Sequence, residues 1–194
     1  MRSLKALPLL IISLFFTPAF AESPVSFKGQ ASFVSDAPME KINGVSKASG
    51  EITMDPKDLT GLHGVVKVPV SSMKTGNEKR DDHMYSPMWL DAKRCPEVSF
   101  SFKGAEVMST KTKGEVTATQ LKVKGEFSLH CVKKEIETVV ELKTKGELAK
   151  VTSSFEVALK DFEVKGKEGI VGSKVGNTIA VNVTLKGRFP KAEK

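Results

Sequence analysis

The sequence is poor in the residues and motifs that most enzymes and nucleic-acid-binding proteins depend on. Its 194 residues include two cysteines, three histidines, one tryptophan and one tyrosine. It contains no Gly-x-Ser-x-Gly elbow, no Walker loop and no dinucleotide-binding fingerprint. Lysines alternate with acidic residues and form no compact basic block, and few aromatic rings are available to stack on bases. We therefore expect neither catalysis nor a nucleic-acid partner.

Long apolar runs are also absent after residue 21, but the first 21 residues contain a short one. Arg2 and Lys5 form a positive start, an uncharged apolar run follows, and Ala19-Phe20-Ala21 has the small-x-small pattern of a signal-peptidase site. The run is short for a membrane span, and no cysteine lies at the cleavage site. We expect a signal peptide over residues 1–21 and one exported domain over residues 22–190. Loss of the leader's two cations lowers the net charge from +7 to +5.

Histidine spacing gives no sign of a metal centre. His63, His83 and His130 are far apart and show neither i, i+4 spacing nor a Cys-x-x-Cys partner. An alternative is an enzyme in which the three histidines and Cys131 come together around a metal or haem. No orienting motif supports it. We expect no metal site and no catalytic residue.

Alternation of apolar and polar residues is the dominant pattern after the leader. The clearest alternating segments are residues 98–102, 121–129, 154–159 and 178–185, and the weaker ones are 26–34, 45–54, 62–70 and 136–142. Such segments are typical of strands with one buried face. We expect an all-β domain of about eight strands, with one or two short helical turns in residues 74–96. The pattern alone leaves a sandwich and a closed barrel open, and also a filled and a hollow interior.

Three stretches carry a more specific signal. The first, from Val68 to Phe100, includes Thr-Gly, Arg-Asp-Asp-His-Met and a Trp-containing turn that ends in Cys-Pro. The second is Gly-Glu-Phe-Ser-Leu-His-Cys-Val-Lys-Lys at 125–134, and the third is the pair of segments 155–162 and 175–185. Together they resemble the YceI-like family of exported, lipocalin-shaped proteins. The resemblance covers nearly all of the chain after the leader, and it implies an eight-stranded antiparallel up-and-down barrel.

The two cysteines, Cys95 and Cys131, are 36 positions apart. An even count in an exported chain favours a disulfide over a metal site, with two separate buried thiols as the alternative. They stand where the YceI-like pattern usually has Tyr and Gly, and this double departure strengthens the expectation of a pair. Closing a loop of this size stabilises the fold by roughly 4 kcal/mol at best.

The resemblance implies a ligand, a long isoprenoid chain of a polyprenyl lipid or a quinone, along the barrel axis. Burial of one five-carbon unit contributes roughly 4 kcal/mol at ~0.8 per CH₂, whereas association costs ~4–15 kcal/mol. Two or three units barely offset that cost, so we expect selection by tail length. The expected inward-facing lining is Val66, Val68, Phe100, Phe102, Val123, Phe127, Phe155, Val157, Val181 and Val183, with Met84, Tyr85 and Trp89 as a lid.

Polar residues beside this lid have two interpretations. In the first, Arg80 and His83 contact the ligand's head group, with Arg80 donating to a phosphate or carbonyl. In the second, Asp81 or Asp82 caps a short helix, and Arg80 pairs with a carboxylate under the loop.

Two functions from different classes follow. The first is an exported carrier, periplasmic or otherwise secreted, that holds an amphipathic isoprenoid and needs no other cofactor. The second is a stress-related structural or interaction barrel with a filled core, whose basic outer surface meets a membrane or a partner. Transient membrane-surface contact and a monomeric or homodimeric state are expected for the carrier.

Overall fold

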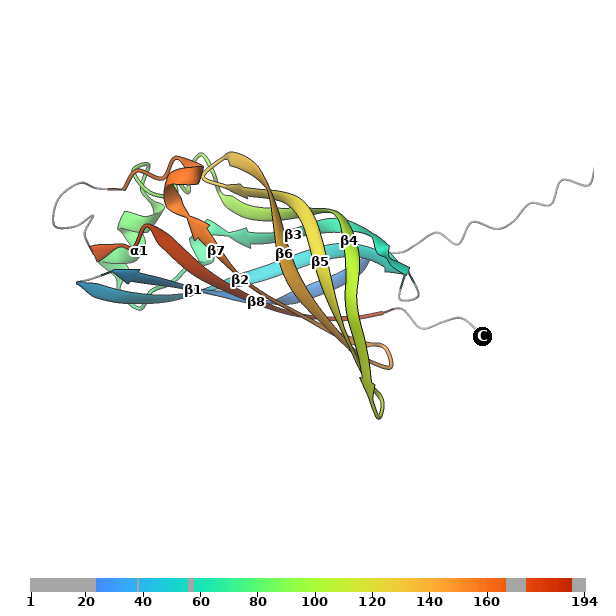
Figure 1. Ribbon diagram of the computed structural model, residues 1–194. Coiled ribbons are helices and arrows are strands. Elements are labelled where there is room, and N and C mark those ends of the chain that lie inside the picture. The colour runs from blue at the N-terminus through green and yellow to red at the C-terminus, as the bar shows by residue number, and fades with distance from the viewer. Residues whose placement is uncertain (1–23, 38, 56–57, 167–173, 190–194) are drawn as a thin grey trace, which may run out of the picture.

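The structure, a computed structural model, describes residues 24–37, 39–55, 58–166 and 174–189. The expected leader, residues 1–21, lies outside this part of the chain. The strands are β1 Val25–Ala37, β2 Glu40–Asp55, β3 Asp58–Pro69, β4 Glu97–Lys113, β5 Val116–Leu129, β6 Val132–Lys145, β7 Leu148–Ala158 and β8 Thr178–Arg188. Each strand pairs antiparallel with the next, and β8 returns to β1, so the sheet closes (Figure 1). The expected all-β, eight-stranded barrel is confirmed, and the sandwich alternative is wrong.

Alternation along the strands produces the inside and the outside of this barrel. In β2, buried and exposed residues alternate along nearly the whole strand. Phe27 of β1 is fully buried, and its partners in the register are Gly50 on one side and Gly187 on the other. A Cβ at Gly187 would lie 2.8 Å from the Phe27 ring. Glycine therefore leaves the space that this large inward side chain occupies.

The segment between β3 and β4 lies across one end of the barrel (Figure 1). It contains the short 3-10 helix η1 Val70–Ser72 and the helix α1 Glu78–Tyr85. The helix α1 confirms the expected helical turn within residues 74–96, whereas η1 lies before that range. Asn77 caps α1, because its side-chain oxygen accepts from the backbone N–H of Arg80 at 3.1 Å. The expectation that Asp81 or Asp82 provides the cap is therefore wrong. No helix within the described ranges is long and apolar enough to cross a membrane.

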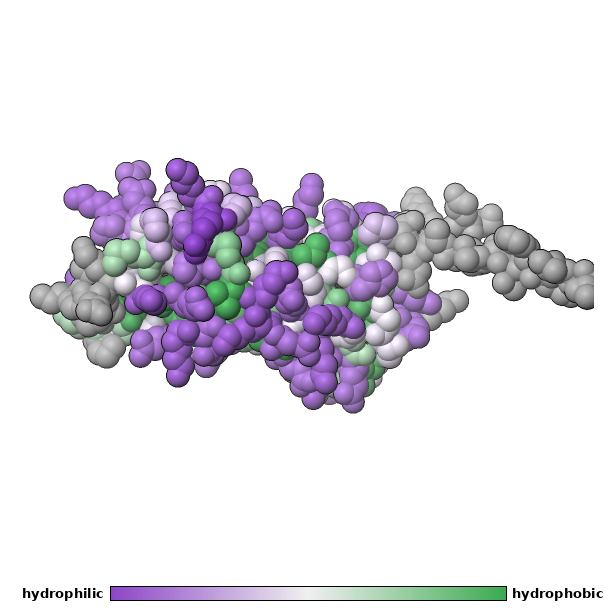
Figure 2. Space-filling view, turned by 90° about the horizontal axis from the view of Figure 1, so that it is seen from above, coloured by the Kyte–Doolittle hydropathy of each residue, from purple (hydrophilic) through white to green (hydrophobic). Residues whose placement is uncertain are grey.

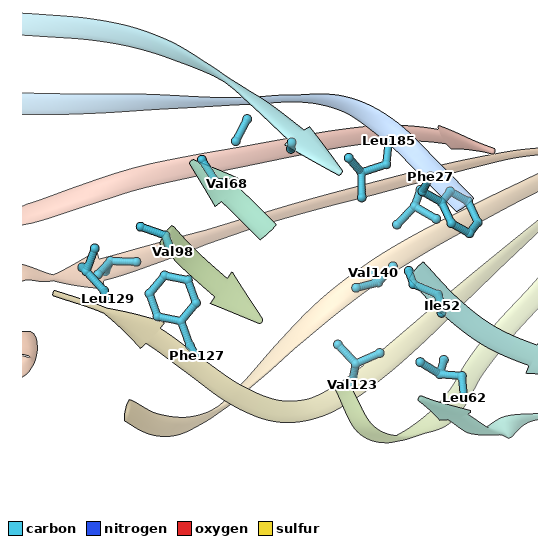
Figure 3. Packing of buried hydrophobic residues seen from close by; sticks show 14 of the residues in the cluster. Phe27, Ile52, Leu62, Val68, Val98, Val123, Phe127, Leu129, Val140 and Leu185 are labelled. Carbon is cyan, nitrogen blue, oxygen red and sulfur yellow. The ribbon is translucent and has the colours of Figure 1, made fainter. Parts of the chain in front are cut away.

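Buried apolar side chains fill the half of the barrel away from α1. Figure 3 shows Phe27, Ile52, Leu62, Val123 and Leu185 gathered together, apart from Val68, Val98, Phe127 and Leu129. The space left in this filled half is small, about 20 Å³ beside Ile52, Leu62 and Val123. We call the half next to α1 the hollow half.

The two cysteines form a disulfide. Cys95 and Cys131 are joined, with their Cα atoms 5.4 Å apart, so the predicted pairing is confirmed and the alternative of separate thiols is wrong. Cys131 lies in the two-residue turn between β5 and β6, where it and His130 have φ of 61° and 52°. The bond ties the segment that follows α1 to this turn, at the hollow half of the barrel.

Interleaved lysines and acids form ion pairs on the outer face of the barrel. Lys103 lies 2.9 Å from Glu135, while Lys122 and Lys124 lie 2.8 and 3.2 Å from Glu137. The hydrogen bond from Lys103 lowers the pKa of Glu135, and those from Lys122 and Lys124 lower the pKa of Glu137. The pairs are exposed and screened by salt, so they contribute little to stability. Hydrophilic residues also dominate the face of the molecule drawn in Figure 2.

Candidate functional site

The hollow half encloses a cavity of about 470 Å³. Its walls are inward-facing residues of all eight strands, and α1 with the loop after it contributes Met84, Trp89 and Leu90. This volume lies within the range of small-molecule binding sites in proteins. The barrel is therefore neither filled throughout nor hollow throughout.

Eleven of the thirteen residues expected to line a cavity do line this one. They are Val66, Val68, Met84, Trp89, Phe100, Phe102, Phe127, Phe155, Val157, Val181 and Val183. The Trp89 ring packs against Gly166, where a Cβ would lie only 2.7 Å from the ring. A ligand contact for any of these residues stays a prediction.

Two residues of the expected lining lie elsewhere. Val123 points inward but belongs to the filled half, where it is fully buried beside the small second cavity. Tyr85 is not in the wall either, because its hydroxyl donates to the carbonyl of Met73, and the Lys74 ammonium lies 5.2 Å from its ring centroid. Tyr85 therefore braces α1 against the preceding segment and does not form part of a lid.

The structure adds lining residues that the sequence interpretation missed. Leu129, Val140 and Ile179 continue the same alternating series and could have been found from it. Thr138 and Ser153 also line the cavity. Polar residues at inward positions carry no apolar signal, so the alternation could not identify them.

Charged and polar groups gather at the end of the cavity next to α1. We define the mouth cluster as the cavity-lining residues Glu40, Lys79, Arg80, His83 and Lys174. The predicted head-group candidates Arg80 and His83 are thus brought to one place. Lys79, His83 and Lys174 are exposed, so this end of the cavity faces water.

Arg80 is held by neighbouring protein groups. Its Nη1 donates to Glu40 Oε1, its Nε donates to Thr75 Oγ1 at 3.0 Å, and its Nη2 donates to the carbonyl of Thr75 at 3.1 Å. The predicted pairing with a carboxylate is confirmed in Glu40. No ion pair within the described part of the chain involves Lys79 or Lys174. The uncompensated positive charge of the mouth cluster therefore belongs to these two lysines.

Asp81 organises the turn behind Arg80. This carboxylate is 3% exposed and accepts from the backbone N–H and the hydroxyl of Thr75, at 2.8 and 2.7 Å. Burial raises the pKa of Asp81, but the Thr75 hydrogen bonds and the attraction of Lys74 together outweigh it and lower the pKa. Asp81 is thus charged and fully engaged inside the protein.

The histidines do not form a metal centre. No group of three or more His, Cys, Asp or Glu side chains that could hold a metal ion occurs among the described residues. His63 Nδ1 lies 3.0 Å from the carbonyl of Gly61, and His130 Nδ1 lies 3.1 Å from that of Phe162. His83 lies at the mouth cluster. Because Cys131 is in the disulfide, the expected metal alternative has no thiolate ligand.

Comparison with known protein sequences identifies relatives of this chain. A family model described as "YceI-like domain" matches residues 19–187. A UPF0312 protein of Vibrio cholerae serotype O1 is 29% identical over 126 residues, which cover 62% of this chain and 62% of the relative. Another from the same species is 33% identical over 85 residues, covering 44% of this chain and 41% of the relative. The chain thus aligns with less than two thirds of the length of either relative.

Solved structures share the fold at low sequence identity. BcnA of Burkholderia cenocepacia matches with a TM-score of 0.67 and 18% identity, over 82% of this chain and 95% of that one. A polyisoprenoid binding domain from Saccharophagus degradans matches with a TM-score of 0.66 and 13% identity, over 87% and 99%. The Campylobacter jejuni YceI protein matches with a TM-score of 0.59 and 20% identity, over 74% and 82%. At identities of 20% or less, these matches show that the barrel fold is shared and nothing more.

Proposed function

This chain belongs to the YceI-like family, and from that premise we propose that it is an exported binding protein that holds the tail of an isoprenoid lipid or quinone. The observation that carries the proposal is the 470 Å³ cavity, walled by valine and phenylalanine, in a barrel whose other half is filled. The structural neighbour from Saccharophagus degradans, described as a polyisoprenoid binding domain, agrees with this choice of ligand.

The cavity volume limits how much of a tail is enclosed. An apolar cavity of about 150 Å³ accommodates the six carbons of benzene. A volume of about 470 Å³ therefore holds on the order of three or four five-carbon units. At roughly 4 kcal/mol per unit, this burial contributes on the order of 12–16 kcal/mol before the association cost of ~4–15 kcal/mol. Shorter tails leave part of the cavity empty and bind weakly, while longer tails extend past it.

The mouth cluster suits an anionic head group. Among the described residues, no acidic side chain forms an ion pair with Lys79 or Lys174, and His83 lies with them at the exposed end. We assign these three side chains to the head group, with Arg80 holding the rim through Glu40 and Thr75. A lysine ammonium binds a phosphate as a point charge and makes few geometric demands. The tail thus supplies most of the affinity, and the lysines orient the ligand.

A titration with isoprenoid alcohols of increasing length tests the proposal. The chain has one tryptophan, Trp89, and it lines the cavity, so its fluorescence reports occupancy. Affinity is expected to rise with each unit from two to about four and then to level off. Affinity independent of length, or no response at any length, would contradict tail binding. The alternative of a structural barrel without a ligand predicts that second result.

Export, location and assembly are separate parts of the proposal. We propose cleavage after Ala21, action in the periplasm as a carrier, and transient contact with the membrane from which the ligand is taken. The mass of the protein recovered from a periplasmic extract tests the cleavage, since the mature chain begins at Glu22. Transfer of a fluorescent polyprenyl lipid between vesicles tests the carrier role, and sedimentation distinguishes a monomer from a homodimer.

A further inference from the structure

The ladder between β6 and β7 stops halfway along the barrel. The two strands pair only where Val140–Lys145 faces Leu148–Ser153. Beyond this point residues 132–139 pair with β5 alone, and residues 154–158 pair with β8 alone. We call this interval the seam. At ~3.3 Å per residue, the five unpaired residues of β7 make it about 17 Å long.

The seam runs along the cavity. Thr138 on β6 and Ser153, Phe155 and Val157 on β7 border it, and all four line the cavity. Among the residues that the structure describes, no backbone hydrogen bond therefore separates this part of the cavity from the outside. The β3–β4 ladder next to the cavity is instead continuous from residue 64 to residue 69.

A second interruption, between β2 and β3, is covered. There Val45 and Lys74 exchange two backbone hydrogen bonds of 2.9 and 2.8 Å, and the backbone N–H of Lys47 donates to Ser72 Oγ at 3.1 Å. The segment that carries α1 thus replaces the missing ladder. Along the seam, no described segment makes backbone hydrogen bonds in place of the missing ladder.

Only side-chain contacts close the seam. At the end of the seam that lies halfway along the barrel, Ser153 Oγ donates to the carbonyl of Val139 at 2.9 Å and lies 3.2 Å from Thr138 Oγ1. At the other end of the seam, near the β5–β6 turn, the short 3-10 helix η2 Leu159–Phe162 places the carbonyl of Phe162 3.1 Å from His130 Nδ1. Inside, the rings of Phe155 and Phe162 pack edge-on against Phe127, with centroids 5.7 and 5.4 Å away.

We propose that the seam is a lateral portal for the isoprenoid tail, with Ser153 as its latch; this inference rests on the proposed function. Opening the seam breaks the hydroxyl contacts of Ser153, the contact of His130 with Phe162 and the 3.9 Å ion pair of Lys134 with Asp161. It also slides aromatic rings, but it breaks no backbone hydrogen bond between strands. Entry by the mouth cluster would instead drag a hydrocarbon past Glu40, Lys79 and Arg80. Through the seam the tail enters sideways while the head group stays in water.

The experiment is stopped-flow binding of geranylgeraniol to the full chain, followed by Trp89 fluorescence. In Ser153→Ala both latch contacts are lost, so the association and dissociation rate constants are each expected to rise about fivefold or more. Thr138→Val removes one of the two contacts and has a smaller effect. The double variant is expected to be less than additive, because the two residues share a hydrogen bond.

Ser154→Ala is the matched control. This neighbouring serine donates to Asn182 Oδ1 at 2.7 Å, on the side of β7 that remains paired with β8. Wild-type rates are expected for it. If Ser153→Ala and Ser154→Ala give equal rates while the wild type binds the probe, the portal is refuted and the proposed function stands. If the wild type binds no isoprenoid of any length, the proposed function and the portal are both refuted.

Discussion

Enlarging one cavity residue tests whether the barrel is hollow where the structure places its cavity. Val181 lies on β8 in the cavity wall, opposite Phe33 on β1 and Phe155 on β7, and is partly exposed to the empty space. In Val181→Phe four additional carbons enter that space. Because they fill a void, the free energy of unfolding is expected to stay the same or to rise by about 0.5–2 kcal/mol.

The same substitution in the filled half is the control. Val123 is fully buried, and the nearby space is only about 20 Å³. Val123→Phe therefore overpacks the core and is expected to lower the free energy of unfolding by about 1–3 kcal/mol. Urea denaturation followed by far-ultraviolet circular dichroism measures both variants. Equal destabilisation by the two substitutions would refute the division of the barrel into hollow and filled halves.

Ligand binding provides the second measurement. The ring in Val181→Phe takes the place of about four tail carbons, so long tails are expected to lose about 3 kcal/mol of binding, roughly a hundredfold in Kd. Tails of two units, which fit into the remaining space, are expected to lose much less. A uniform loss over all lengths would show that Val181 does not limit how far the tail enters.

Two further predictions concern residues around the site. Asp81→Asn leaves the Thr75 N–H and hydroxyl without a charged acceptor and is expected to lower the free energy of unfolding by about 1–3 kcal/mol at pH 7. Because the pKa of Asp81 is lowered in the folded state, its stabilisation is present above the unfolded pKa of about 3.9 and is lost as the pH falls through the folded pKa. The gap between variant and wild type in urea denaturation should therefore close below about pH 4, and a gap independent of pH would contradict this role. The double variant Cys95→Ala/Cys131→Ala opens a 36-residue loop and is expected to lower the free energy of unfolding by up to roughly 4 kcal/mol, and a midpoint equal to that of the wild type would contradict a stabilising disulfide.

The regular parts of the fold were predictable because their cause is local. Each strand has an apolar side and a polar side, and this period is visible in residues such as Val181 and Val183 without any partner strand. The same parity placed nine of its ten residues in the cavity wall. It failed for Val123, which has the right parity but lies at the filled end, because parity describes in or out and carries no position along the barrel axis.

The polar part of the site was less accessible to prediction. Arg80 and His83 were recognised from a motif, but the partner of Arg80 is Glu40, forty positions earlier in the chain. One of the two interpretations expects Asp81 or Asp82 to cap the helix, whereas Asn77 caps it and Asp81 accepts from Thr75. Several side chains compete for the same few donors in such a turn, and only the path of the backbone decides among them.

Strand number and the inward parity of most cavity residues follow from local patterning of apolar and polar side chains, whereas the closed up-and-down order was implied by the resemblance to the YceI-like family. The position of the void and the break between β6 and β7 do not, because they depend on how far each pair of strands stays in register and on which side chains meet across the barrel. Those are distances between residues remote in the chain, and such distances are defined only once the sheet has closed.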